Sequence, residues 1–207
     1  MLDAPVYALI LENPYRYSIM LRVLDPPPEG WHEIPYLDPE SVERRSRYSP
    51  TPMDEGYPMD PAGVPRKLRW ESKKPLPDVV MASSVNIVSD DIRSTSESFE
   101  PGVHQFLPAE TYRQKDPTPL AHYHWLIACR RIDGVERSLT TWRQGLGEFW
   151  ERAGEDSRLV LSLKAIGAAH LWRDPYLLGY LFCSNALANA LAARPHLGWD
   201  FMPFEAA

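Results

Sequence analysis

Two histidines separated by a single residue are the side chains in this chain whose type and spacing most resemble a reactive site. His122 and His124 fall on one face of a predicted strand, because successive strand residues alternate sides. Two imidazoles placed in this way could ligate Zn²⁺. A third ligand is missing nearby, since Asp116 lies in a proline-rich turn and Cys129 has the opposite parity. We therefore predict structural or exposed histidines, with no metal and no cofactor.

Two serines could act as nucleophiles only if a base met them. Ser89 and Ser184 each precede Asp or Asn at the predicted start of a helix. Neither lies in the Gly-x-Ser-x-Gly turn that presents a catalytic serine. A serine at a helix start instead accepts a hydrogen bond from a free backbone N–H of the first turn. We predict that both serines are helix caps and that the chain has no catalytic residue.

The charged clusters have ordinary explanations. Asp90 and Asp91 could bind a cation, but an acidic pair also suits the positive end of a helix dipole. The arginine run 44–47 could meet a phosphate, but Glu40 and Glu43 balance its charge. The sequence has no Gly-x-Gly-x-x-Gly, no P-loop and no Cys-x-x-Cys. These patterns favour a protein without catalytic chemistry.

A repeat describes the elements that position these side chains. Segments 86–110 and 181–205 match without a gap at one offset, since 201 − 106 = 95. Internal repetition reports architecture directly. The identical pairs are Ser89 and Ser184, Phe106 and Phe201, Pro108 and Pro203, and Glu110 and Glu205. Each segment is predicted to form a strand, a serine-capped helix and a second strand.

Details within the two segments predict further structural roles. The first helix is rich in Ser and Thr, so we expect it to be short or frayed. Gly102 and Gly198 are expected to end turns before the closing strands. Pro108 and Pro203 should stop those strands or hold them at a sheet edge. The residues predicted to be structural are Ser89, Phe106, Pro108, Trp172, Ser184, Phe201 and Pro203.

Several short elements complete the prediction. Many strands and few helices give an α+β, strand-rich single domain over residues 1–207, containing the two similar strand–helix–strand units. Besides these units, we predict strands at Val6–Leu11, Tyr17–Leu24, Tyr123–Arg130 and Arg158–Ile166, and a helix at Thr141–Ala153.

A long proline-rich segment separates the first strands from the rest of the chain. Residues 25–77 hold twelve of the 21 prolines. Proline lacks an N–H and fixes φ, so the segment is predicted to wrap over the surface and to form no central strand. Loops of this length in a compact domain are usually functional or disordered, and a surface loop without a role is the alternative.

Composition limits the partners and the compartment. The formal charge of −6 argues against nucleic acid, which needs a basic face. No apolar run approaches the ~20 residues that span a bilayer, and the first residues do not resemble a signal peptide. Cys129 and Cys183 are widely spaced and in apolar contexts, which predicts reduced thiols. We expect a cytoplasmic protein with neither nucleic-acid nor membrane partners.

A family resemblance appears in short motifs from about Trp70 to Glu205. The chain resembles immunity protein family eleven of bacterial polymorphic toxin systems. The motifs are Leu76–Asp78, Asn86–Asp90, Phe106–Pro108, Ile132–Asp133 with Ser138, His170–Arg173, Phe182–Ser184 and Gly198–Phe201. The resemblance implies a cytoplasmic, non-catalytic antidote that binds a cognate toxin or effector protein.

Loops on a rigid scaffold often carry recognition, which directs the site prediction to the proline-rich segment. We predict toxin contacts at Asp54, Glu55, Tyr57 and Asp60. Two other classes remain open. One is a small enzyme that uses His122, His124 or His170 with a carboxylate; the other is a non-catalytic scaffold or oligomerisation module, for which self-association is expected.

Overall fold

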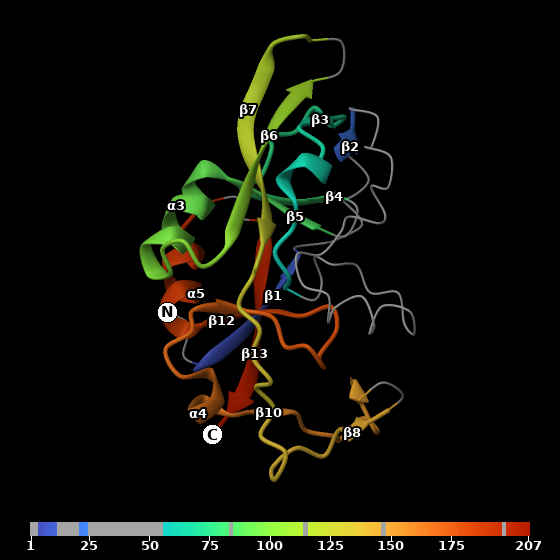
Figure 1. Cartoon of the computed structure of the whole chain (residues 1–207), viewed down its shortest axis with the longest axis vertical. Coiled ribbons are helices and arrows are strands. Elements are labelled where there is room, and N and C mark those ends of the chain that lie inside the picture. The colour runs from blue at the N-terminus through green and yellow to red at the C-terminus, as the bar shows by residue number, and fades with distance from the viewer. Residues whose placement is uncertain are drawn as a thin grey trace.

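The structure is a computed structural model of the whole chain (Figure 1). It describes residues 4–11, 21–24, 56–82, 85–113, 116–145, 148–195 and 198–207. These residues form two large sheets, one small sheet and few helices, which confirms a strand-rich α+β fold.

The first sheet has six strands and curls into a near-closed barrel. Its order is β2-β3-β6-β7-β5-β4, and the edge strands β2 and β4 lie against each other. A hydrophobic cluster that includes Trp70 and Trp125 fills its interior. The strands are β2 (Leu21–Val23), β3 (Lys67–Trp70), β4 (Val79–Ala82), β5 (Val85–Ser89), β6 (Gln105–Arg113) and β7 (Pro119–Ile127).

The second sheet has five strands in the order β10-β13-β1-β12-β11. One of its faces carries a cluster built around Trp172 and Phe182, whose stacked rings have centroids 5.8 Å apart. The predicted structural residue Trp172 is fully buried there. The strands are β1 (Val6–Leu11), β10 (Val160–Leu161), β11 (Leu171–Trp172), β12 (Leu181–Ser184) and β13 (Trp199–Ala206).

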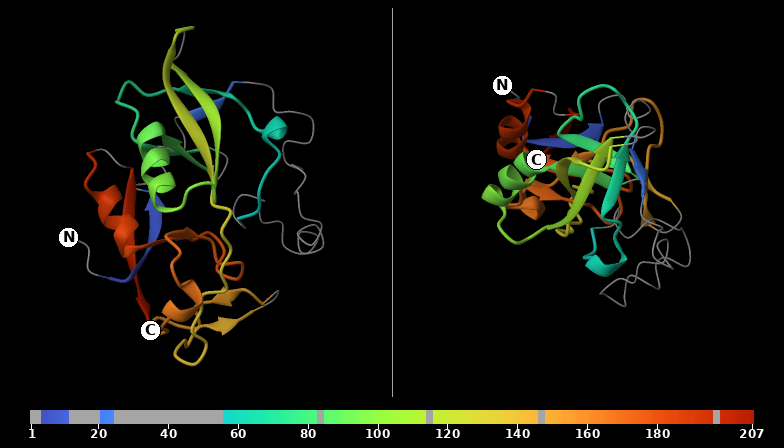
Figure 2. Two further views of the ribbon diagram at one scale, coloured as in Figure 1. Left: turned by 60° about the vertical axis from the view of Figure 1, so that its left-hand side comes forward. Right: turned by 90° about the horizontal axis from the view of Figure 1, so that it is seen from above.

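Helices α3 (Asp90–Phe99) and α5 (Asn185–Ala192) pack against each other beside the two sheets (Figure 2). A central hydrophobic cluster contains residues of both helices and both sheets, such as Val79 and Leu126 of the first sheet and Leu9 of the second. Phe106 and Phe201 are half-buried and pack against this cluster. The central cluster therefore couples the two sheets.

Both repeat segments form the predicted strand–helix–strand unit. The first is β5-α3-β6 and the second is β12-α5-β13. In each sheet the two strands of the unit flank one antiparallel central strand, which is β7 in the first sheet and β1 in the second. His124 of β7 lies opposite Val88 and Pro108. Tyr7 of β1 is the counterpart of His124.

The repeat is kept in register in three dimensions. Tyr7 lies opposite Cys183 and Pro203, which are 95 positions after Val88 and Pro108. The outer strands agree as well. The matching parallel pairs are Lys67 with Glu110 and Val160 with Glu205, and the matching antiparallel pairs are Val79 with Val88 and Leu171 with Cys183.

The described chain therefore contains one five-stranded arrangement twice. The first half comprises β3, β4, β5, α3, β6 and β7, and the second half comprises β10, β11, β12, α5, β13 and β1. In the first half the central strand follows the unit in the chain, whereas β1 of the second half precedes everything else. The two halves are thus related by a circular permutation.

The two prolines of the repeat lie inside strands, next to a gap in the sheet. Pro108 pairs with β7 on one side, while β3 begins its pairing with β6 only at Glu110. Pro203 likewise pairs with β1, while β10 begins at Glu205. Both strands continue beyond the proline. A proline that cannot donate to the ladder is tolerated where one neighbouring strand is absent, although β6 and β13 are themselves inner strands of their sheets.

Three predicted elements differ from the structure. Thr141–Ala153 is not helical: its described residues form the short hairpin strands β8 (Arg143–Gln144) and β9 (Trp150–Glu151). Glycines disfavour a helix in this segment. Arg158–Ile166 is a strand only at β10 and then turns into α4 (Leu163–Ile166). The helix α3 has ten residues and is longer than α5 with eight, although it was expected to be the weaker one.

The hydroxyls of α3 bond to carbonyls of their own helix. Thr95 Oγ1 donates to the carbonyl of Asp91 at 2.8 Å, and Ser98 Oγ donates to that of Thr95 at 2.7 Å. Such bonds satisfy a hydroxyl without breaking the helix.

The proline-rich segment contains an inner strand. The predicted strand Tyr17–Leu24 is described only as β2 and Leu24, and residues 25–55 lie outside the described chain. The 3₁₀-helix η2 (Pro61–Gly63) and β3 follow, and β3 lies between β2 and β6. The expectation that 25–77 forms no central strand is therefore wrong at Lys67–Trp70. These four residues contain no proline, so their N–H groups are free to pair.

Candidate functional site

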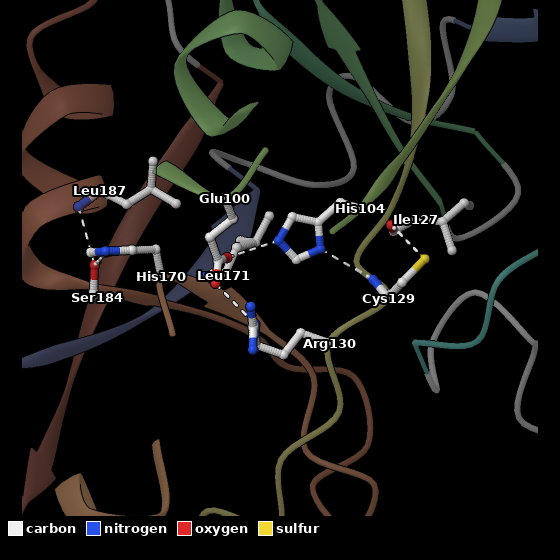
Figure 3. Close-up of polar contacts among 9 residues, drawn as sticks. All are labelled: Glu100, His104, Ile127, Cys129, Arg130, His170, Leu171, Ser184 and Leu187. Carbon is white, nitrogen blue, oxygen red and sulfur yellow. Dashed lines mark hydrogen bonds and ion pairs between the residues drawn. The ribbon is translucent and has the colours of Figure 1, made fainter. Parts of the chain in front are cut away.

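A buried carboxylate lies where the two halves meet. Glu100 follows the last residue of α3, and only 5% of it is exposed. Its Oε2 accepts hydrogen bonds from Nε2 of His104 at 2.9 Å and from the backbone N–H of Leu171 at 2.8 Å (Figure 3). The first donor belongs to the first half and the second to β11 of the second half. Glu100 therefore ties the halves together.

His104 has its tautomer fixed by the backbone. The N–H of Cys129 donates to Nδ1 of His104 at 3.2 Å. A backbone N–H can only donate, so Nδ1 accepts and the ring proton lies on Nε2. That proton is donated to Glu100.

Arg130 supplies the positive charge next to this carboxylate. Its Nε lies 2.9 Å from Oε1 of Glu100, and 37% of the arginine side chain is exposed against 4% of the glutamate side chain. Arg130 Nε and Glu100 Oε1 do not have the geometry of a hydrogen bond, so their contact is an ion pair. We call Glu100, His104 and Arg130 the junction triad.

Burial and hydrogen bonding act on Glu100 in opposite directions. Burial disfavours the charged form, but the hydrogen bonds from His104 and from the backbone of His170 and Leu171 outweigh it. The pKa of Glu100 is consequently lowered from its ordinary value. The carboxylate therefore remains charged at neutral pH.

The second half folds without a triad at the equivalent place. The positions 95 residues after Glu100 and His104 hold Pro195 and Trp199. The repeated unit itself therefore does not require the carboxylate and the imidazole. Their function in this chain is to connect the halves and to hold Arg130.

The two predicted cap serines lie at equivalent helix starts. Ser89 Oγ accepts from the N–H of Ile92 at 3.4 Å, and Ser184 Oγ accepts from the N–H of Leu187 at 3.2 Å. Each hydroxyl also has a second partner from the preceding edge strand segment. These partners are Asp78 for Ser89 and His170 for Ser184, both at 2.8 Å. The equivalence marks the Ser184–His170 contact as part of a capping device.

We expect Ser89→Ala and Ser184→Ala each to lower the free energy of unfolding by about 0.5–2 kcal/mol, because each leaves a helix N–H without its acceptor. Urea denaturation measures the change. Ser94→Ala is the matched control: Ser94 is exposed within α3, and alanine is the better helix former. Equal effects of all three substitutions would contradict the capping roles.

The two histidines of β7 are separated by their surroundings. His124 Nε2 lies 2.6 Å from Oδ1 of Asp90, at the start of α3. His122 is exposed and lies opposite Glu110 of β6. No group of three or more His, Cys, Asp or Glu side chains with metal-binding placement occurs among the residues that the structure describes. Asp90 and Asp91 also have partners, since Asp91 pairs with Arg194.

A second buried carboxyl lies in the turn after β11. Asp174 is 2% exposed; its Oδ2 accepts from the N–H of Gly134 and its Oδ1 from that of Tyr176, each at 2.8 Å. Burial raises the pKa of Asp174 to about 6, although these backbone bonds oppose the shift. The carboxyl holds the connection between the halves against the second sheet.

Asp174 is expected to titrate with a midpoint of about 6. Between about pH 6 and pH 3.8, Asp174 carries a proton in the folded protein, whereas the carboxyl of the unfolded chain, with a pKa of 3.8, is ionised. The contribution of Asp174 to the free energy of unfolding therefore rises as the pH falls through this window, by roughly 3 kcal/mol in total. NMR titration of the side-chain carboxyl carbon measures the midpoint. A midpoint near 3.8 would show that burial does not control this group.

Two of the four predicted toxin-contact residues lie within the described chain, and two lie outside it. Asp54 and Glu55 lie outside the described residues. Tyr57 is 8% exposed, and the guanidinium carbon of Arg131 lies 3.8 Å from the centre of its ring. Asp60 is half-buried and accepts from the N–H of Ala62 at 2.9 Å at the start of η2. The arginine run 44–47 also lies outside the described residues.

Sequence reasoning missed the junction triad and Asp174. Glu100 and His104 are four residues apart, but they follow the helix, so their contact depends on the turn that ends it. The contact of Glu100 with Leu171 spans 71 residues. Both cysteines are free as predicted; Cys183 is buried, and Cys129 is only partly buried.

Comparison with protein-family models gives a match over most of the chain. The model of the immunity protein family (Imm11) matches residues 23–206, which is nearly the whole chain. No curated protein matches the chain significantly. In the described part of the chain, no helix is long and apolar enough to cross a membrane. Because the family match covers well over half of the chain, including both strand–helix–strand units and the junction between them, the chain belongs to the Imm11 family of immunity proteins.

Proposed function

We propose that this protein binds a cognate bacterial toxin or effector and neutralises it by occlusion, without catalysis of its own. Membership of the Imm11 immunity family is the observation that carries the proposal. Such a protein needs a rigid scaffold and a recognition surface. The duplicated fold with its shared central cluster is a scaffold of this kind.

The polar groups of the described chain support binding rather than catalysis. His104, His124 and His170 are each held by a structural partner. Ser89 and Ser184 are occupied as helix caps. A hydrolytic site needs a nucleophile, a base and an orienting group that face a substrate. The serine–histidine contact at the start of α5 has a sufficient role in capping.

The partner and the compartment follow from the same proposal. The partner is a toxin protein, the encounter takes place in the cytoplasm, and neither nucleic acid nor membrane takes part. The charge of −6 supports the exclusion of nucleic acid. Asp54, Glu55, Tyr57 and Asp60 remain predicted contacts, of which Asp60 is half-buried at the start of η2.

Co-expression with the product of the neighbouring gene tests the proposal. Cells that express the neighbour alone should stop growing, and cells that express both proteins should grow. The two proteins should also elute together in gel filtration. If the neighbour is not toxic, or stays toxic without forming a complex, the proposal fails.

A further inference from the structure

Arg130 stands out because the duplicated scaffold does not require it. The first strand–helix–strand unit ends in Glu100 and His104, where the second has Pro195 and Trp199. Both units nevertheless form the same sheet register and the same serine cap. A buried carboxylate costs desolvation energy, and an ion pair around it is weak evidence of stabilisation. The presence of a buried carboxylate in the first unit alone therefore needs an explanation in the surroundings of Glu100.

Besides joining the halves, this carboxylate orients the arginine. Glu100 is buried and faces the Nε edge of Arg130, while 37% of the arginine side chain is exposed (Figure 3). Within the described chain, its two terminal amino groups make no hydrogen bond or ion pair. A guanidinium offers parallel donors that match a carboxylate along one edge. Glu100 therefore fixes the Nε edge of Arg130, and the two terminal amino groups of Arg130 can donate to a partner.

The neighbouring side chains suit a protein contact. Phe99 and His170 are half-buried, and their rings meet edge-on with centroids 4.8 Å apart. His170 precedes Leu171, whose N–H binds Glu100, so these rings lie beside the triad. Aromatic rings around an arginine are typical of the residues that carry binding energy. We call Phe99, Arg130 and His170 the junction surface.

The charge near the junction surface is positive in an acidic protein. Arg131 and Arg173 are paired across the connection between the halves, and Arg173 N–H donates to the carbonyl of Arg130 at 2.9 Å. Glu100 and Asp174, the carboxyls next to these arginines, are both buried. Arg173 is itself buried and Arg131 is half-buried, so the positive charge that a partner meets here is mainly that of Arg130.

We propose that the junction surface contacts the cognate toxin, with Arg130 binding an Asp or Glu side chain of the toxin through its terminal amino groups. The inference rests on the proposed toxin-binding function. Because Glu100 fixes the guanidinium before the encounter, little side-chain freedom is lost on binding. The aromatic pair excludes water around the charged contact.

The test measures the affinity of the purified neighbouring-gene product for the wild type and for Arg130→Gln by calorimetry, at low and high salt. We expect Arg130→Gln to raise Kd at least about 30-fold. We also expect the salt dependence of Kd to be weaker in this variant, because an ion pair is lost. Arg130→Lys should lie between the two, since lysine keeps the charge and loses the paired donors.

Two controls separate recognition from structure. Arg93→Gln removes an arginine of similar exposure that pairs with Glu97 on α3, and it should leave Kd within about threefold. Ile87→Val weakens the barrel core away from the junction surface, so it should lower the unfolding temperature without changing Kd.

The outcomes distinguish the inference from the function. If the wild type binds and Arg130→Gln binds equally well, the inference is overturned and the proposed function stands. If Ile87→Val or Arg93→Gln loses affinity as much as Arg130→Gln, the loss reflects structure and the inference is overturned. A wild type that does not bind overturns both.

Discussion

Glu100→Gln is expected to lower the free energy of unfolding by about 3–5 kcal/mol, the range for breaking a buried ion pair by removing one partner. The amide oxygen can take the place of Oε2 and accept from His104 and Leu171, but the amide NH2 then faces the Nε–H of Arg130, donor against donor. Arg130 also loses its counter-charge. The variant should therefore loosen the contact between the halves.

A matched substitution on the same helix provides the control. Glu97→Gln changes the same chemical group three residues earlier, but Glu97 is 36% exposed in its pair with Arg93. Such pairs contribute less than about 1 kcal/mol. Urea denaturation of both variants measures the difference. Equal changes would contradict the role of Glu100 as a clasp.

Acid should remove the same contribution in the wild type. The pKa of Glu100 is lowered in the folded protein, so its contribution is present above the unfolded pKa and is lost as the pH falls through the folded pKa. Glu100→Gln should lack this part of the acid dependence.

Gly198→Ala is expected to lower the free energy of unfolding by about 2–5 kcal/mol through two effects. Gly198 has φ +86°, a conformation that alanine adopts only with strain. A Cβ on Gly198 would also lie 2.3 Å from the carbonyl oxygen of Val79. Val79 belongs to β4 of the first half, while Gly198 leads into β13 of the second. The close approach of the two backbones therefore requires glycine.

Gly102→Ala separates strain from collision. Gly102 has φ +70°, and a Cβ there meets nothing within 4 Å. This variant should lose only the strain contribution, about 1–2 kcal/mol. Thermal unfolding of both variants gives the difference. A Gly198→Ala protein as stable as Gly102→Ala would show that the halves do not meet closely at Val79.

The features that the sequence predicts best are local. Ser89 and Ser184 predict helix starts because a short side-chain oxygen acts within three residues. The constant offset of 95 predicts the two units because the serine cap and the closing Phe-x-Pro-x-Glu stand at the same spacing in both, although α3 has ten residues and α5 has eight. The same local logic places Pro108 and Pro203 where a neighbouring strand is missing.

The duplication beyond these units is hidden by chain order. The central strands β7 and β1 are equivalent in space, yet β7 follows its unit and β1 precedes its own. The offset of 95 that relates the other equivalent residues does not relate His124 to Tyr7, because Tyr7 comes earlier in the chain. Similarly, β3 pairs with β6 through partners about 40 residues away, which no local pattern records.

The candidate site was less predictable than the fold. The junction triad depends on two long-range contacts, from Glu100 to Leu171 and from His104 to Cys129. Each partner in them is a backbone N–H, which every residue except proline carries. Residue types therefore give no signal for such contacts. The toxin-contact prediction at Tyr57 and Asp60 followed the proline-rich composition instead.

Titration of the purified toxin with this protein tests the central claim most directly. The toxin activity of the neighbouring-gene product is measured at a fixed concentration well above Kd while the protein is added stepwise. An occluding antidote predicts that activity falls linearly and is abolished near one equivalent. Full toxin activity in a large molar excess of the protein would contradict neutralisation by binding.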